Sequence, residues 1–169
     1  MNGTPQRLVV ADSGQQSSRG ARSDQLLAWS VLGISGFLFF MVGALDVLLV
    51  WYPLNFGVPD WEFFVISASL NGLPAPTIGL ALMGASAVAH GHLTRARVCA
   101  ALLGLISVLV VVLLVIFATN VPIALKAQVA PGADVGVKKA IVKVAGQALF
   151  YPVFLAWIAK RIWTRGSRA

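Results

Sequence analysis

The chain has few of the residues from which most catalytic and metal sites are built. Its 169 residues include one cysteine, two histidines and six acidic residues, and charged residues make up 11% of the total. The single cysteine, Cys99, excludes a disulfide within the chain, and we interpret it as a small apolar residue in a helix contact. Soluble globular proteins carry about a quarter charged residues, so this composition is atypical of a water-soluble domain.

Hydrophobic residues make up 58% of the chain and gather in four long stretches. A helix needs about 20 apolar residues to cross roughly 30 Å of hydrocarbon, and apolar runs without strict alternation form helices instead of barrel strands. The sequence therefore predicts an all-α, polytopic membrane protein with one four-helix transmembrane domain over residues 24–163. The spans are expected at about 26–52, 74–91, 98–122 and 138–160.

Basic residues lie in short clusters beside the apolar stretches. Nine of the thirteen fall in the N-terminal segment, the 90–97 link and the C-terminal segment, which would share one side of the membrane. The positive-inside rule then predicts that both termini are cytoplasmic. Topology also accounts for the net charge of +7, so no nucleic-acid partner is expected. The four basic residues expected on the opposite side are Lys126, Lys138, Lys139 and Lys143.

Both ends of the chain are polar. Residues 1–23 have too little apolar surface to order themselves, and we predict a disordered cytoplasmic tail there. The first helix is expected to begin near Asp24, because a carboxylate favours the positive end of the helix dipole. Residues 164–169 are predicted to be a short basic cytoplasmic tail.

Two interpretations of residues 60–89 are open. Pro74 and Pro76 remove amide donors and predict a break or kink, as does Pro152 in the fourth stretch. One interpretation is a single kinked and tilted helix; the other is an interfacial helix over 61–70 followed by a shorter span. We favour the second slightly, because a straight helix of about 29 residues would be roughly 43 Å long, well beyond the hydrocarbon thickness.

Asp46 is an acidic residue inside a predicted span. An ionised carboxylate near the centre of a bilayer costs about 2.5 to 3.5 kcal/mol, although six residues before Tyr52 correspond to only about 9 Å from the interface. One interpretation is a proton or cation site. The other, which we favour, is a structural pair with Lys143 or Lys126, or a hydrogen bond to Asn120.

His90 and His92 are weak candidates for holding a haem or a pigment at one end of the second span. Haem in a bundle requires histidines on facing helices, and the chain has no third histidine, so we interpret both as interfacial residues. The link around them lacks the further ligands of a zinc site. No cofactor or metal is expected. No catalytic residue is assigned either, because no nucleophile or base accompanies Asp60 and Glu62, which we interpret as a helix cap and an interface anchor.

Small and aromatic residues indicate how the helices pack and where they are anchored. Ala81, Ala85 and Ala89 recur at four-residue spacing and predict a close packing seam, which we prefer to a seam through Gly33 and Gly36. Amphipathic aromatic rings favour the interfaces between hydrocarbon and water. The expected interfacial anchors are Trp29, Trp51, Tyr52, Trp61, Trp157 and Trp163.

The run Pro59-Asp-Trp-Glu-Phe63, followed by Leu73-Pro-Ala-Pro-Thr-Ile-Gly-Leu80, resembles a segment of uncharacterised bacterial four-helix membrane proteins. It is also similar to the membrane part of the HpsJ polysaccharide-secretion family of cyanobacteria. The similarity covers about residues 45–84. It implies a bacterial inner-membrane location and a conformational role for the Trp-Glu-Phe and Pro-x-Pro elements, and it carries over no catalytic residue.

Four helices with short links enclose little volume, which favours a non-enzymatic accessory or scaffold subunit that packs against another membrane protein. The expected partners are the lipid bilayer and either that protein or further copies of this chain. Two alternatives stay open. One is a small oligomeric transporter or channel that uses Asp46, and the other is a pigment- or haem-binding subunit through His90 or His92.

Overall fold

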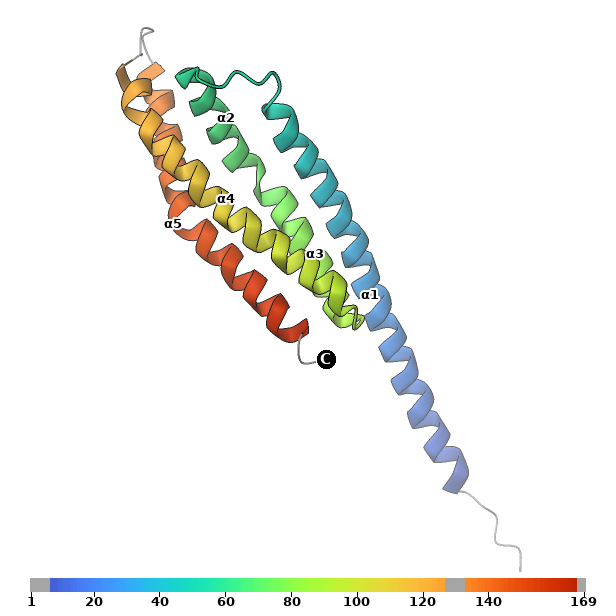
Figure 1. Ribbon diagram of the computed structural model, residues 1–169. Coiled ribbons are helices and arrows are strands. Elements are labelled where there is room, and N and C mark those ends of the chain that lie inside the picture. The colour runs from blue at the N-terminus through green and yellow to red at the C-terminus, as the bar shows by residue number, and fades with distance from the viewer. Residues whose placement is uncertain (1–6, 127–132, 167–169) are drawn as a thin grey trace, which may run out of the picture.

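The protein is a bundle of long helices that run up and down beside one another (Figure 1). The computed structural model describes residues 7–126 and 133–166. Within these residues every regular element is helical, which confirms the all-α prediction, and four segments are long and apolar enough to cross a membrane. The helices are α1 (Arg7–Val50), α2 (Pro59–Gly72), α3 (Pro74–Ala89), α4 (Leu93–Lys126) and α5 (Ala133–Gly166).

Helix α1 begins much earlier than expected. Residues 7–23, predicted to be a disordered tail, continue the helix upstream of Asp24 and project beyond the other helices (Figure 1). The physical reason is that a membrane-length helix supplies its own nucleus, so adding further turns costs little where no proline intervenes. At the other terminus α5 extends to Gly166, into the predicted basic tail, and residues 167–169 lie outside the described part of the chain.

Helices α2 and α3 form one kinked helix. Leu73, between them, keeps helical dihedral angles (φ −56°, ψ −29°), and its N–H donates to the carbonyl of Ser69 at 2.9 Å. The N–H of Thr77 then donates to the carbonyl of Leu73 at 3.2 Å. Because Pro74 and Pro76 have no N–H, two bonds of the ladder are missing at this junction. The predicted kink therefore lies where the prolines are.

Helix α2 packs inside the bundle and not across its end. Its Ile66 and Leu70 are 3% exposed and belong to a cluster with Leu113 and Phe117 of α4. The structure thus has the kinked helix over residues 60–89, in place of the separate interfacial helix expected over 61–70. The cause is the apolar face of α2, which α4 covers along its length.

A second apolar cluster surrounds α3. Leu80 of α3, Ala96 and Leu103 of α4 and Leu155 of α5 are nearly completely buried there. Cys99 lies in the same cluster and is 5% exposed, which agrees with its interpretation as a small apolar residue in a helix contact.

A very short link joins α3 and α4 as an antiparallel hairpin. Gly91 takes the left-handed conformation (φ +73°), which non-glycine residues rarely adopt. The N–H of His92 donates to the carbonyl of Ala87 at 2.8 Å, and the N–H of Gly91 donates to that of Val88 at 3.1 Å. This is the Schellman termination of a helix. We call this end of the bundle the His90 end, and the opposite one the Trp51 end.

Helix α1 lies at the edge of the bundle. Among the described helices it contacts α2 and α3 but neither α4 nor α5. Glycines allow the close approach: a Cβ added at Gly36 would lie 2.7 Å from the carbonyl oxygen of Gly79, and one at Gly33 would lie 2.7 Å from Oγ of Ser86. The closest helix seam therefore runs through the glycines of α1 and not through the alanines of α3.

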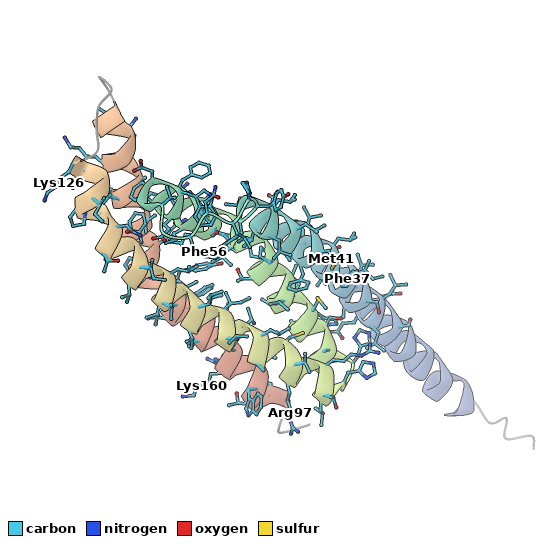
Figure 2. The ribbon with its side chains drawn as sticks, turned by 45° about the horizontal axis from the view of Figure 1, so that its top comes forward. Phe37, Met41, Phe56, Arg97, Lys126 and Lys160 are labelled. Carbon is cyan, nitrogen blue, oxygen red and sulfur yellow. The ribbon has the colours of Figure 1, made fainter. Side chains whose placement is uncertain are left out.

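The basic side chains separate to the two ends of the bundle. Figure 2 shows Arg97 and Lys160 at the His90 end and Lys126 at the opposite end. This distribution matches the one from which the positive-inside rule predicts cytoplasmic termini.

Candidate functional site

A carboxylate organises the Trp51 end. Oε1 of Glu62 accepts the N–H of Gly57 at 2.9 Å, and its Oε2 accepts Nδ2–H of Asn120 at 2.9 Å. Asn120 is buried, so the carboxylate satisfies an amide that water does not reach easily. Helix α2 begins at Pro59 with Val58 as the N-cap and no side-chain cap, so the predicted cap at Asp60 is not formed. Glu62 instead ties the preceding loop and α4 to the first turn of α2.

Three aromatic rings also cluster at the Trp51 end. The Trp51 and Trp61 rings meet edge to face with centroids 6.1 Å apart, and Phe56 lies 5.6 Å from Trp61. Nε1–H of Trp51 donates to Oγ of the buried Ser69 at 2.9 Å. Trp51 and Trp61 are half-buried and packed against each other, whereas Tyr52 is 82% exposed and is free to act as the predicted anchor.

Two hydroxyl groups meet beside the α2–α3 kink. The hydroxyls of Thr77 on α3 and Tyr151 on α5 share a short hydrogen bond. Oγ1 of Thr77 also lies 2.9 Å from the carbonyl of Leu73. Since a threonine hydroxyl has one proton and donates it to that carbonyl, Tyr151 is the donor to Thr77. One residue further along α5, the carbonyl of Pro152 accepts Oγ–H of the buried Ser107 at 2.9 Å. The kink is therefore bonded to α5 through Tyr151, and α5 is in turn bonded to α4 through Ser107.

Replacing Tyr151 by phenylalanine should destabilise the bundle by about 0.6 kcal/mol, and by less than about 2 kcal/mol, the range measured for side-chain hydrogen bonds between membrane helices. The loss is measured by titrating the detergent-solubilised protein with a denaturing detergent. Tyr52→Phe is the matched control, because Tyr52 is exposed and its hydroxyl forms none of these bonds. An equal effect of both substitutions would contradict the role of the Thr77–Tyr151 pair.

His90 joins α3 to α1. Its Nδ1 lies 2.8 Å from the carbonyl of Ser86 and its Nε2 lies 3.1 Å from Oγ of Ser30. Oγ–H of Ser86 donates to the carbonyl of Trp29 at 2.8 Å, which adds a second bond between the same helices. Both ring nitrogens of His90 thus have partners in this arrangement. His92 is exposed and stacks on His90 with centroids 6.2 Å apart. Over the described residues, no group of three or more potential ligands is close enough to hold a metal ion.

Asp46 has none of the expected partners. It is exposed on α1, and Lys143 and Lys126 lie on helices that α1 does not contact. Asn120 bonds to Glu62 instead. Among the described residues, Asp46 forms no hydrogen bond or ion pair. The predicted structural pair is therefore not formed, because the fold places α2 and α3 between Asp46 and the helices that carry the lysines.

The alanine series of α3 lies along a groove. Ala81 and Ala85 are half-buried and Ala89 is exposed; all three line a hollow between α1 and α5. Trp29 and Trp157 line the same hollow, while Trp163 is 49% exposed on α5. The seam predicted through these alanines is thus an open groove at the His90 end.

Several polar contacts had no clear signal in the sequence. Thr77 and Tyr151 are 74 residues apart, and Glu62 and Asn120 are 58 apart. Each residue is ordinary by itself, and only the packing of α2–α3 against the antiparallel α4 and the parallel α5 brings the partners together. The Ser86 bond was detectable in principle, since a serine within an apolar helix often bonds to a neighbouring helix.

The chain was compared with known protein-family models, with curated proteins and with solved structures, and nothing in these comparisons matches it. The resemblance of the Trp-Glu-Phe and Pro-x-Pro elements to bacterial four-helix membrane proteins stays a prediction.

Proposed function

We propose that the chain is a non-enzymatic accessory or scaffold subunit of a bacterial inner-membrane complex, with cytoplasmic termini, and that α1 packs against the partner protein. The placement of α1 at the edge of the bundle carries this proposal. Only 11% of the most apolar window in α1 is buried, against 44% in the α2–α3 segment and 33% in α4. Helix α1 therefore offers the most open apolar surface for a neighbouring helix.

Asp46 supports the choice of α1. It lies four residues before α1 ends at Val50, about 6 Å along the helix axis, and its neighbours Leu45 and Leu48 are 53% and 66% exposed. A carboxylate at this depth is stabilised when an adjacent helix supplies a donor. The partner is therefore expected to place a basic or amide side chain at the level of Asp46.

Photo-crosslinking in the native membrane tests this proposal. A photoreactive residue replaces Leu38 on α1, which is 58% exposed, or Val108 on α4, which is 62% exposed. The Leu38 position is expected to give a stoichiometric adduct with one membrane protein, and the Val108 position is expected to give none. Asp46→Leu should lower the Leu38 adduct about three- to tenfold, the equivalent of one polar contact between helices. Asp60→Leu, which removes an exposed acid outside α1, should not.

Other outcomes would contradict the accessory role and favour an alternative. Adducts between copies of this chain alone would favour the oligomeric transporter or channel, in which Asp46→Asn abolishes transport. Visible absorption bands in the purified protein would favour the pigment- or haem-binding subunit, and loss of these bands in a His92 variant would identify the ligand.

A further inference from the structure

The groove beside α3 is large enough to hold part of a small molecule. It has a volume of about 520 Å³, within the range of ligand-binding pockets, and it lies at the His90 end between α1 and α5. Trp29 forms one wall, and Trp157 and Ile158 form the other. Because α1 and α5 do not contact each other, the two walls of the groove are not joined.

The floor of the groove is smooth and apolar. Ala81, Ala85 and Ala89 lie one helical turn apart and have no side chain beyond Cβ, so they leave a shallow channel along α3. The first and the last of them are eight residues apart, which is about 12 Å along the helix and close to the hydrocarbon depth of about 15 Å in one leaflet of a bilayer. A segment of an acyl chain matches this length and polarity.

Two arginines of α5 line the channel. Arg161 and Arg165 both line the groove and are four residues apart, so they share one face of α5. The guanidinium of Arg161 lies 5.3 Å from the ring centroid of Trp157, which orients it over the groove wall. No aspartate or glutamate is among the residues that line the groove, and neither arginine forms an ion pair within the described residues. Within the described part of the chain, no acidic side chain at the groove compensates this positive charge.

We propose that this groove binds one anionic phospholipid, with an acyl chain over the alanine floor and the phosphate between Arg161 and Arg165. Guanidinium groups bind phosphate oxygens in a bidentate manner, and basic pockets between membrane helices are suited to acidic headgroups. A partner helix fits less well, because the floor is only about two turns long and a helix would need an acid to compensate the arginines. The proposal does not depend on the partner proposed for α1.

A second groove on the other side of α3 shows why the charge matters. It lies between α1 and α4, is somewhat larger at about 600 Å³, and is lined by His90, His92 and a single arginine, Arg95. It lacks the pair of arginines on one helix face. If volume alone governed lipid retention, this second groove would hold lipid equally well and the arginine pair would not affect the result.

Native mass spectrometry of the purified full chain tests the proposal. The protein in mild detergent is mixed with phosphatidylglycerol or with phosphatidylcholine of the same acyl chains, and retained lipids are counted. One phosphatidylglycerol is expected to be retained preferentially. Arg161→Gln with Arg165→Gln should weaken its binding about 25-fold, at roughly fivefold for each arginine. Lys139→Gln with Lys143→Gln removes two exposed charges at the same spacing from the other end of α5, and should change binding less than twofold.

A steric variant tests the apolar half of the site. Ala85→Phe fills the floor and should weaken retention of phosphatidylglycerol at least fivefold, whereas Ala101→Phe, at an exposed position on α4, should not. If the double arginine variant does not purify as a folded protein, Arg165→Gln alone should still weaken binding about fivefold. Equal retention of the two lipids, or equal loss in the arginine and lysine variants, would overturn the proposal.

Discussion

Replacing Gly79 by valine is expected to force α1 away from α3 and to destabilise the protein more than any surface substitution. A Cβ at position 79 would lie 2.5 Å from the carbonyl oxygen of Gly36 and 2.5 Å from the backbone nitrogen of Phe40. Neither atom can rotate aside, because both belong to the backbone of α1. Overpacking in a core costs about 1 to 3 kcal/mol. Here a whole helix must shift, so we expect a loss at the upper end of this range or above it.

The loss is measured as the shift in the midpoint of denaturing-detergent titration, followed by circular dichroism. Gly104→Val on α4 is the matched control, because a Cβ there meets nothing within 4 Å. Both substitutions place the same β-branched side chain in a helix, so their difference isolates the close approach of α1. Equal midpoints for the two variants would show that α1 and α3 are not in close contact in solution.

Gly79→Val also tests the proposal that α1 packs against a partner protein. Asp46 lies on α1 only three residues beyond Gly43, which packs against Pro76 of the kink. A displaced α1 would move Asp46 relative to the rest of the bundle. If the partner contacts both α1 and the rest of the bundle, Gly79→Val should also lower the amount of adduct formed from position 38. Gly104→Val should leave this amount unchanged.

The number of apolar spans could be predicted because it depends on composition. The antiparallel order of consecutive spans could be predicted because the links are short. Runs of about 20 apolar residues form helices in a membrane, and links as short as residues 90–92 force antiparallel neighbours. The positions of the helix ends were harder to predict. The upstream turns of α1 and the packing of α2 against α4 depend on nucleation by the adjoining helix and on tertiary contacts, which local polarity does not reveal.

The helix neighbours could not be predicted because these helices are apolar on all sides. A soluble helix reveals its buried face by its polar one, but in α4 apolar residues occupy both the buried and the exposed faces: Leu103 is completely buried and Leu105 is 65% exposed. The glycines of α1 and the alanines of α3 both have the spacing of a packing seam. Which series forms the seam depends on the angular placement of α1 against α3.

The polar pairs could not be predicted for the same reason, because they depend on which helices are neighbours. Asn120 is one of the three partners that the sequence suggests for Asp46, beside Lys143 and Lys126. In the fold α2 contacts α4, whereas α1 does not contact α4. Asn120 therefore bonds to Glu62 of α2. Predicting this pair requires knowing that α2 belongs inside the bundle, which depends on the kink keeping helical geometry at Leu73.

Replacing Glu62 by alanine is expected to loosen the whole Trp51 end. The substitution removes the acceptor of Asn120 Nδ2 and of the N–H of Gly57 at once. Hydrogen bonds to charged groups contribute about 1.5 to 3 kcal/mol, and a buried donor left without a partner adds its own cost. We therefore expect the midpoint of the denaturing-detergent titration to fall clearly. Asp60→Ala, two residues away and exposed, should cost less than about 0.5 kcal/mol.

Protease added to the solubilised protein gives a second and more local readout. The 52–58 loop is closed over α2 by the Gly57–Glu62 bond and by the packing of Phe56 on Trp61. Glu62→Ala should increase cleavage in this loop several-fold, because local opening exposes its backbone. Cleavage in the 90–92 link at the opposite end should stay unchanged. Increased cleavage at both ends would indicate global unfolding and would contradict a local role.

A double-mutant cycle separates the two bonds of Glu62. Asn120→Ala removes the donor on α4 but leaves the bond to Gly57 intact, so by itself it should cost less than Glu62→Ala. Once the carboxylate is absent, removing Asn120 should cost little more, since its amide has already lost its acceptor. The loss in the double variant is therefore expected to be smaller than the sum of the two single losses. Strictly additive losses would show that Asn120 and Glu62 act independently, and the loop would then be the only part of the protein that depends on the carboxylate.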